Sequence, residues 1–317
     1  MSLCLSRIHD LKDLIMKNAF TPVNLDDMAV YQKFHTASGT RAADYSFTNL
    51  WGWAEHYGLE WQFTEKLCWI RQTKPFIRYW APMGWWKDVD WAASGEFAKG
   101  REFFRVPRPL RLIWEEQLPA ILDVAGSRGQ WDYLYKAEEL ATLSGNRFHK
   151  KKNLFNQFLK KYPDYQYMPL TLECVEEVLR MQEKWCLWNE CPESDALQAE
   201  NTAIFRVLSH WDQLPGLMGG FLSLDGKVVA YTVGEQLTTD TLVIHFEKGD
   251  TQYKGVYQAI NCFFARDAVG KFTYINREQD LDDEGLRKAK ESYNPVDYVR
   301  KNTVRIEARL DEEDKKK

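Results

Sequence analysis

The sequence predicts an α/β (α+β) fold of two tandem units, each a mixed, mostly antiparallel sheet flanked by helices. The chain has 317 residues, which suits two domains of about 150 residues each. The order of helices, strand meander, helix and strand also occurs twice along it. With 44% hydrophobic and 28% charged residues, the composition is that of an ordinary globular protein and excludes a collagen-like or disordered chain. We expect one unit over residues 1–165 and a second over residues 166–317.

Helices and short aromatic strands alternate in the first half. Asn24, followed by two aspartates, predicts the start of a helix, because such residues satisfy or complement the free N–H groups of a first turn. The elements expected are helices over residues 25–35 and 46–56, strands over 59–63, 67–72 and 76–81, a helix over 91–104, a strand over 111–114, a helix after 115 and a strand over 132–135.

Tryptophan gathers in this first unit. Eight of the 13 tryptophans lie between residues 51 and 91. Because alternating aromatic side chains on short strands bury well, we expect most of them to form the core of the unit. Trp85 and Trp86 lie in a turn beside glycine and proline, so they are predicted to be exposed and to contact an acceptor or a membrane surface.

The second half repeats the order of elements. Asp225-Gly226 separates two alternating apolar segments, which is a strong hairpin signal. Around it we expect helices over residues 172–188 and 195–213, strands over 218–224, 227–235 and 241–246, a helix over 255–268, a strand over 272–276 and a helix over 284–291. The repetition indicates a tandem duplication with its divide between residues 161 and 168.

Charge, hydropathy and cysteine content limit the class of protein. The net charge is −4, so the chain as a whole does not attract nucleic acid or an anionic membrane. No apolar segment reaches the roughly 18 residues of a spanning helix, and charged residues interrupt any signal peptide, which predicts a cytoplasmic protein. The six cysteines show no ligand spacing, so we expect reduced thiols and no metal site.

A basic segment stands out in this acidic protein. Residues 144–162 contain six lysines or arginines and no acidic residue. Arg147, Lys150 and Lys151 gather at the start of a predicted helix, where cations oppose the macrodipole, and this favours an anionic ligand such as a phosphate or RNA. His149 lies among them and is a candidate general base. A solvated basic helix is the alternative.

A glycine turn precedes the helix expected over residues 255–268. Gln252 and Gly255 have the spacing of the pyrophosphate loop of the GCN5-related N-acetyltransferases, Q/R-x-x-G-x-G/A. Tyr257 replaces the last small residue, and its ring would obstruct a phosphate. The resemblance therefore supports the fold more than coenzyme A binding, and a plain strand-to-helix turn is the alternative.

Polar residues follow the strand expected over residues 272–276. Sites form at strand ends in α/β sheets. Glu278 and Asp280 can accept hydrogen bonds from a substrate ammonium group, and Arg277 can face a phosphate or carboxylate. Helix capping explains residues 282–284 without any site.

Several segments together resemble the C-terminal catalytic domain of phosphatidylglycerol lysyltransferase, over roughly residues 20 to 305. The positions that carry the resemblance are 44–51, 132–135, Leu140, Leu143, Gly145, Arg147, His149, Lys150, Lys151, Asn153, Phe158, 247–248, 255–261, 276–281, 285–290, Tyr293 and Pro295. That family is similar to the Fem-type aminoacyltransferases, which implies two acetyltransferase-like domains in tandem. It also implies transfer of an aminoacyl group from aminoacyl-tRNA to a hydroxyl or amine acceptor, either a lipid or a small molecule. The membrane-embedded lysyltransferases carry a transmembrane region that this sequence lacks, so the acceptor stays open.

The resemblance assigns roles to the candidate residues. The residues that bind the donor are Arg147, His149, Lys150, Lys151, Gly255 and Tyr257. The catalytic residues are Lys254, which stabilises the oxyanion, Arg277, and Glu278 and Asp280, which hold the ammonium group. The residues that line the pocket are Asn276, Tyr135 and Asn153. No cofactor is implied, because aminoacyl-tRNA is favoured over coenzyme A as donor. A coenzyme A-dependent N-acyltransferase and a non-catalytic domain that binds a partner or nucleic acid are the alternatives.

Overall fold

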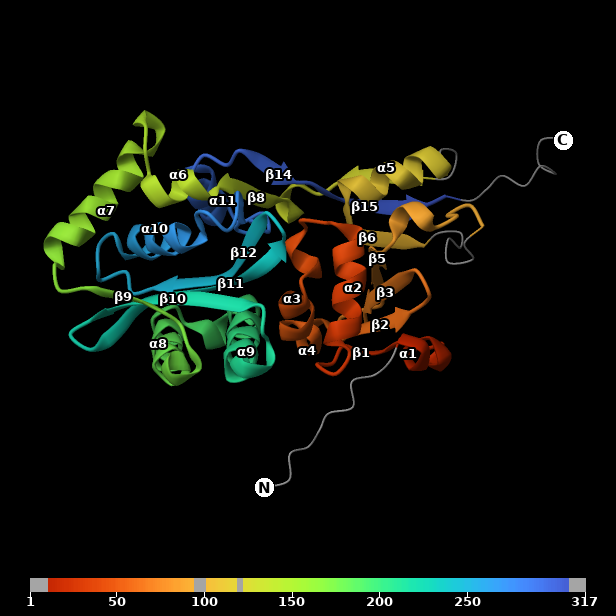
Figure 1. Cartoon of the computed structure of the whole chain (residues 1–317), viewed down its shortest axis with the longest axis horizontal. Coiled ribbons are helices and arrows are strands. Elements are labelled where there is room, and N and C mark those ends of the chain that lie inside the picture. Colours follow the sequence, from red (N-terminus) through yellow and green to blue (C-terminus); the bar gives the residue numbers. More distant parts are fainter. Residues whose placement is uncertain (1–10, 94–100, 119–121, 308–317) are drawn as a thin grey trace, which may run out of the picture. The chain divides into compact units, whose positions relative to one another are not determined.

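The computed structural model describes residues 11–93, 101–118 and 122–307, and the chain divides into two compact units (Figure 1). The first unit comprises the residues up to Trp131 and those from Val299 onward, and the second runs from Asp132 to Tyr298. The boundary expected at residues 165 and 166 therefore lies inside the second unit. Residues 132–161 belong there because they supply a strand of its sheet and two helices of its core.

The first unit is built on one mixed sheet with the strand order β1-β2-β3-β4-β6-β15-β7, and β5 also pairs with β3. Its strands are β1 (Thr21–Pro22), β2 (Leu59–Phe63), β3 (Leu67–Gln72), β4 (Arg78–Trp80), β5 (Met83–Gly84), β6 (Glu102–Pro107), β7 (Leu122–Gly126) and β15 (Lys301–Ile306). Its helices are α1 (Leu11–Lys17), α2 (Met28–Ser38), α3 (Phe47–Gly52), α4 (Ala54–Tyr57) and α5 (Arg108–Gln117). β4 and β6 pair parallel, and the other neighbours pair antiparallel.

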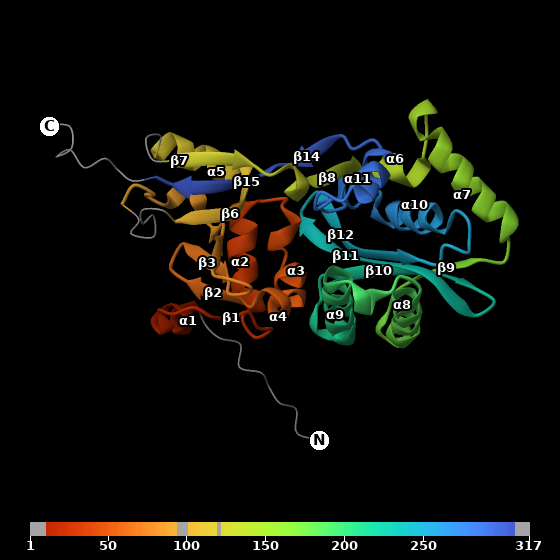
Figure 2. The ribbon, with the colours of Figure 1, turned by 180° about the vertical axis from the view of Figure 1, so that it is seen from behind.

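The second unit has its own mixed sheet, in the order β14-β8-β13-β12-β11-β10-β9. Its strands are β8 (Asp132–Lys136), β9 (Gln166–Pro169), β10 (Leu217–Leu224), β11 (Lys227–Thr238), β12 (Thr241–Gly249), β13 (Tyr274–Asn276) and β14 (Asp297–Val299). Its helices are α6 (Ala137–Thr142), α7 (His149–Lys161), α8 (Val175–Trp188), α9 (Asp195–Ser209), α10 (Val256–Ala268) and α11 (Glu284–Glu291). Helices α8 and α9 cover one face of the sheet and α10 covers the other, as both views show (Figures 1 and 2). Here β12 and β13 form the parallel pair.

The two sheets have the same strand order. From one edge, β1-β2-β3-β4-β6-β15-β7 corresponds position by position to β9-β10-β11-β12-β13-β8-β14. This agreement supports the predicted duplication of one unit. The sixth strand is exchanged: β8 ends the first half of the chain but joins the second sheet, and β15 ends the second half but joins the first sheet.

Aromatic packing forms the core of the first unit, as predicted. Trp61 on β2 stacks on Tyr31 of α2 with ring centroids 5.4 Å apart, and Trp91 packs edge-on against Trp114 of α5 at 5.4 Å. The prediction for the turn is half right. Trp85 is 37% exposed, but Trp86 is buried. The pairing of β5 with β3 holds the turn against the sheet, and the indole N–H of Trp86 donates to the carbonyl of Pro82.

Three predicted elements of the first unit are wrong or partly untested. The helix expected after residue 115 is wrong, because α5 ends at Gln117 and residues 122–126 form strand β7. Residues 111–114 form the middle of helix α5 rather than a strand, because Leu110 and Trp114, four residues apart, share its buried face. The helix expected over residues 91–104 lies partly outside the described residues, and its last three positions belong to β6.

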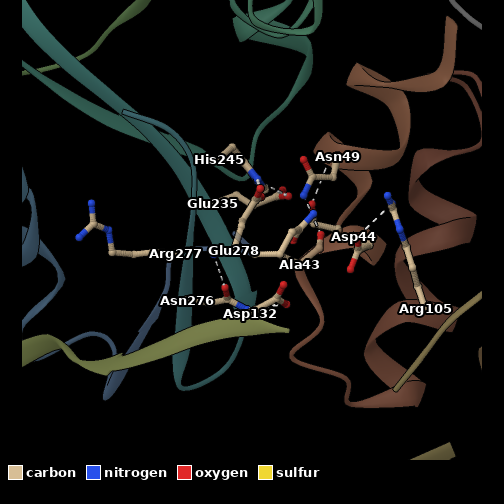
Figure 3. A network of polar contacts seen from close by, with 12 residues as sticks. Ala43, Asp44, Asn49, Arg105, Asp132, Glu235, His245, Asn276, Arg277 and Glu278 are labelled. Carbon is tan, nitrogen blue, oxygen red and sulfur yellow. Dashed lines mark hydrogen bonds and ion pairs between the residues drawn. The ribbon is translucent and has the colours of Figure 1, made fainter. Parts of the chain in front are cut away.

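A buried ion cluster ties the exchanged strand β15 into the first unit. The carboxylate of Asp44 pairs with Arg105 of β6 at 2.9 Å (Figure 3). It also pairs with Lys301 of β15. Burial opposes ionisation of Asp44, but the two cations lower its pKa below the ordinary value. Asp44, one of the residues that carry the family resemblance, thus has a structural role.

The cysteines differ in part from the prediction. Cys186 and Cys191 form a disulfide at the end of α8, whereas Cys68, Cys174 and Cys262 are free, and Cys4 lies outside the described residues. The two cysteines are five residues apart, a spacing that matches no recognised pairing motif. The disulfide was not predicted because only the turn after α8 brings the two sulfur atoms together. Across the described ranges, no helix is both long and apolar enough to cross a membrane.

Candidate functional site

The polar strand end predicted at residues 276–280 lies where β12 and β13 separate. The two strands pair only from Thr241 opposite Tyr274 to Val243 opposite Asn276, and β12 then continues to Gly249 paired with β11 alone. The side chains that follow β13 therefore reach across to β12 and β8 (Figure 3). All of the contacts described below lie within the second unit.

A buried imidazole connects two carboxylates, and we call Glu235, His245 and Glu278 the His245 array. Nδ1 of His245 lies 2.8 Å from Glu278 and Nε2 lies 3.0 Å from Glu235. Burial alone would lower the pKa of His245, but the hydrogen bonds to both carboxylates outweigh it and raise that pKa to about 9. The imidazole is therefore protonated at neutral pH and donates from both nitrogens to the two carboxylates.

Two backbone features aim the members of this array. His245 is the extra residue of a β-bulge, because Val233 pairs with Phe246 and the next residue, Gly234, pairs with Ile244. Bulges redirect side chains and are frequent beside functional sites. Glu278 has a φ angle of 56°, in the left-handed region that non-glycine residues rarely occupy, and such strain is typical of functional positions.

Arg277 brings the strand end to the basic helix α7. Its Nη2 donates to Glu247 of β12 at 2.8 Å, and its Cζ lies 4.9 Å from the ring centroid of Tyr293. Nζ of Lys151 lies 4.3 Å from the same centroid. Partial burial and the nearby Arg277 both lower the pKa of Lys151. Two of the predicted cations thus lie against one aromatic ring, and Arg277 is also paired with a carboxylate.

The remaining strand-end residues are held by buried partners. Asn276 donates to Asp132 at 3.2 Å, and its Oδ1 accepts from the backbone N–H of Glu278 at 2.7 Å. Asp280 is fully buried and accepts two hydrogen bonds from Arg287 at 2.8 Å and one from Tyr133 at 2.6 Å. Burial opposes ionisation of Asp280, but these hydrogen bonds lower its pKa well below the ordinary range. Its carboxylate anchors α11 to the sheet.

Lys290 and Tyr135 support the backbone of the same strand end. Nζ of Lys290 donates to the carbonyl oxygens of Arg277, at 2.6 Å, and of Gln279. Burial lowers the pKa of Lys290 to about 8, although Glu278 acts in the opposite direction. The hydroxyl of Tyr135, predicted as a pocket residue, donates to the carbonyl of Lys290 at 2.7 Å, so it fixes α11 rather than facing solvent.

The glycine turn has a packing role. Gly255 has a φ angle of +88°, and a Cβ atom there would lie 2.4 Å from the carbonyl oxygen of Leu154 on α7. Tyr257 accepts a hydrogen bond from the indole of Trp185 at 3.3 Å, and Lys254 is exposed on the turn. The helix α7 therefore lies directly against the predicted donor loop.

The other predicted residues of the basic segment are on the surface. Arg147 is half exposed and pairs with Glu139, while His149, Lys150 and Asn153 are exposed. Of the basic segment, Lys151 is the predicted donor residue that contacts the strand-end cluster through Tyr293.

Sequence reasoning did not identify His245, Glu235 and Asp132 as members of the site. A signal was present in β12, where His245, Glu247 and Lys248 follow the apolar run Leu242–Ile244. Charged residues in a buried strand are costly unless they are paired, so such interruptions indicate a polar partner on a neighbouring element.

Comparisons with known proteins agree with this architecture. A family model described as the C-terminal region of phosphatidylglycerol lysyltransferase matches residues 36–305. The crystal structure of a conserved protein of unknown function from Bacteroides thetaiotaomicron is 32% identical, covers 91% of this chain and 99% of its own, and has a TM-score of 0.82.

Two further comparisons are more distant. The C-terminal domain of a putative lysylphosphatidylglycerol synthetase from Agrobacterium fabrum is 10% identical, covers 91% of this chain and 94% of its own, and has a TM-score of 0.60, which shows a shared fold. Among curated proteins, an uncharacterised protein from Mycoplasmoides gallisepticum is 24% identical over 181 residues. That match covers 55% of this chain and spans 56% of the relative's length.

Proposed function

Because the chain belongs to the family of the phosphatidylglycerol lysyltransferase C-terminal domain, we propose that it transfers an aminoacyl group from aminoacyl-tRNA to a hydroxyl or amine acceptor. The acceptor forms a bond to the ester carbonyl carbon, the ester C–O bond of the tRNA breaks, and the acceptor proton passes to the departing ribose oxygen. Such a reaction needs a held donor phosphate, a held ammonium group and a stabilised oxyanion.

The charge pattern around Tyr293 carries the proposal. Lys151 and Arg277 lie against one ring, and Glu247 is the carboxylate paired with Arg277. Within the described ranges Lys151 forms no ion pair, so this group keeps one positive charge. A donor phosphate supplies the missing negative charge.

The His245 array supports the other half of the donor. Both of its carboxylates accept hydrogen bonds from the imidazole of His245, and Glu278 is adjacent in sequence to Arg277. An aminoacyl-tRNA carries a phosphate and an ammonium group near the same ester. Neighbouring cationic and anionic groups at one strand end match that combination.

Coenzyme A as donor is less well supported. The carbonyl oxygen of Leu154 occupies the position next to Gly255, and Tyr257 replaces the last small residue of the loop. Both features favour a donor that does not place a pyrophosphate on this turn.

Filter binding with a charged tRNA tests the donor assignment. The variant Lys151→Ala is expected to weaken binding about tenfold, because a charge-assisted contact to phosphate is lost. Lys152→Ala is the matched control, since Lys152 is exposed on the same helix and the substitution removes the same charge. An equal effect of both variants would mean unspecific attraction to α7 and would contradict the assignment.

Calorimetric titration separates the alternatives. Binding of acetyl-coenzyme A in place of aminoacyl-tRNA would favour an N-acyltransferase. Binding of charged tRNA with no release of the amino acid would favour a non-catalytic domain. The proposal expects tRNA binding together with turnover.

A further inference from the structure

A second group of polar side chains surrounds Glu247, on the face of the sheet that α10 covers. We call Thr232, Glu247, Asn261 and Arg277 the Glu247 cluster. Thr232 of β11 is directly opposite Glu247 of β12, so their side chains share a face. Glu247 accepts hydrogen bonds from Arg277 at 2.8 Å and from Nδ2 of Asn261 on α10 at 3.3 Å.

Three polar atoms of this cluster have no hydrogen-bond partner among the residues that the structure describes. They are Oγ1 of Thr232, Oδ1 of Asn261 and Nη1 of Arg277. Thr232 is 0% exposed and Asn261 is 1% exposed. Buried polar atoms are nearly always hydrogen-bonded, because an unpaired one loses its water without compensation. Three such atoms around one carboxylate indicate a bound polar group.

The cluster favours a group that is polar and uncharged. Arg277 and Glu247 neutralise each other, and Thr232 and Asn261 are neutral. The remaining cation nearby, Lys151, is assigned to the donor phosphate, so a charged group in the cluster would be buried without a counter-ion. An apolar group would leave all three atoms unpaired. A hydroxyl or carboxamide can accept a hydrogen bond from Nη1 of Arg277 and donate one to Oδ1 of Asn261. Solvent reaches the cluster at Arg277 and Glu247, whose side chains are 14% and 9% exposed.

We propose that the Glu247 cluster is a specificity site for the transferred amino acid, and that it takes a neutral hydroxyl or carboxamide side chain. The inference rests on the proposed function, since the donor ester delivers that side chain. Arg277 connects the two assignments, because its Nη2 donates to Glu247 and its Nη1 has no hydrogen-bond partner among the described residues.

Amino-acid amides test this without any transfer step. Calorimetry on the full chain compares serinamide, threoninamide and glutaminamide with alaninamide and lysinamide. The hydroxyl and carboxamide compounds are expected to bind at least about tenfold more tightly than alaninamide, the effect of one or two buried hydrogen bonds. Lysinamide is expected to bind no better than alaninamide, because its ammonium group would be buried without a counter-ion.

A substitution of similar shape locates the effect. Thr232→Val removes the hydroxyl and is expected to reduce the preference to about threefold or less, with affinity for alaninamide unchanged. Thr202→Val on the exposed face of α9 is the matched control and is expected to change nothing. Urea unfolding of both variants confirms that they are folded.

Several results would overturn the proposal. Equal binding of all five amides would do so. So would a Thr232→Val variant with unchanged preference, or a crystal structure in which ordered waters fill the three positions and serinamide does not displace them. Failure of the proposed transferase function would give another combination of results. The protein would then still discriminate among the amides but would turn over no charged tRNA. If instead every aminoacyl-tRNA is used equally and the amides are not discriminated, the specificity site fails and the transferase function stands.

Discussion

Replacing Gly255 by alanine separates a packing role of the glycine turn from a phosphate-binding role. A Cβ atom at this position lies 2.4 Å from the carbonyl oxygen of Leu154 and 3.1 Å from Cβ of Phe158, and the φ angle is +88°. A non-glycine residue in the left-handed region costs about 1–2 kcal/mol. Displacing α7 to relieve the overlap costs about 1–3 kcal/mol more. We therefore expect Gly255→Ala to lower the free energy of unfolding by about 2–5 kcal/mol.

Gly39 provides a matched control. It also lies in the left-handed region, with φ 60° and ψ 17°, but a Cβ atom there meets nothing within 4 Å. Gly39→Ala is expected to cost only the backbone strain of about 1–2 kcal/mol. The difference between the two variants, about 1–3 kcal/mol, isolates the close approach of α7.

Urea unfolding followed by far-ultraviolet circular dichroism measures both variants, and filter binding of charged tRNA is measured in parallel. The reasoning is refuted if the two variants lose equal stability. It is also refuted if Gly255→Ala unfolds like the wild type but loses donor binding, because the glycine would then serve a phosphate and not a helix.

Three further predictions concern buried groups. The pKa of His245 is raised to about 9 from an ordinary value of 6.5. The stabilisation by protonated His245 is therefore complete below about pH 6.5 and is lost as the pH rises through about 9. In urea titrations, the difference in free energy of unfolding between the wild type and His245→Gln is expected to shrink by about 3 kcal/mol from pH 6 to pH 10. Asp280 has a lowered pKa, so its stabilisation is present above its ordinary pKa of 3.8 and lost as the pH falls below it. Asp280→Asn is expected to cost about 1.5–3 kcal/mol at pH 7, because charge-assisted hydrogen bonds from Tyr133 and the partly exposed Arg287 are lost, and calorimetry at pH 7 and pH 3 checks that this cost diminishes in acid. Trp86→Ala is expected to cost about 3–5 kcal/mol and Trp85→Ala clearly less, since Trp86 is buried and Trp85 is 37% exposed; equal losses in thermal unfolding would contradict the assigned burial.

Local patterns predicted most elements of the fold. The Asp225-Gly226 hairpin between β10 and β11 forms as expected, because its turn residues and apolar alternation act within a few positions. The exchange of β8 and β15 was beyond this reasoning, since strand pairing over more than 100 residues leaves no periodic signal. Helix α5 was mistaken for a strand because its short apolar segment fits both periods.

The candidate site was predicted in outline. The strand end at Asn276, Arg277 and Glu278 forms a polar centre, as its position after an apolar strand indicated. His245 was missed because its role depends on a bulge, and a bulge shows only in the pairing of strands. Asp280 has the residue type of a ligand-binding carboxylate, but its partner Arg287 lies seven residues away on α11, so the contact depends on how that helix folds back.

Single-turnover transfer from a labelled aminoacyl-tRNA tests the central claim most directly. The wild-type protein should release the label from the tRNA to an acceptor. Arg277→Lys keeps the positive charge but has one terminal nitrogen in place of Nη1 and Nη2. Glu278→Gln removes the carboxylate that accepts from His245. Each variant should slow release at least about 100-fold, as expected for a group that stabilises the transition state. The account would be contradicted if the label stayed on the tRNA with the wild-type protein. It would also be contradicted if both variants released the label as fast as the wild type does.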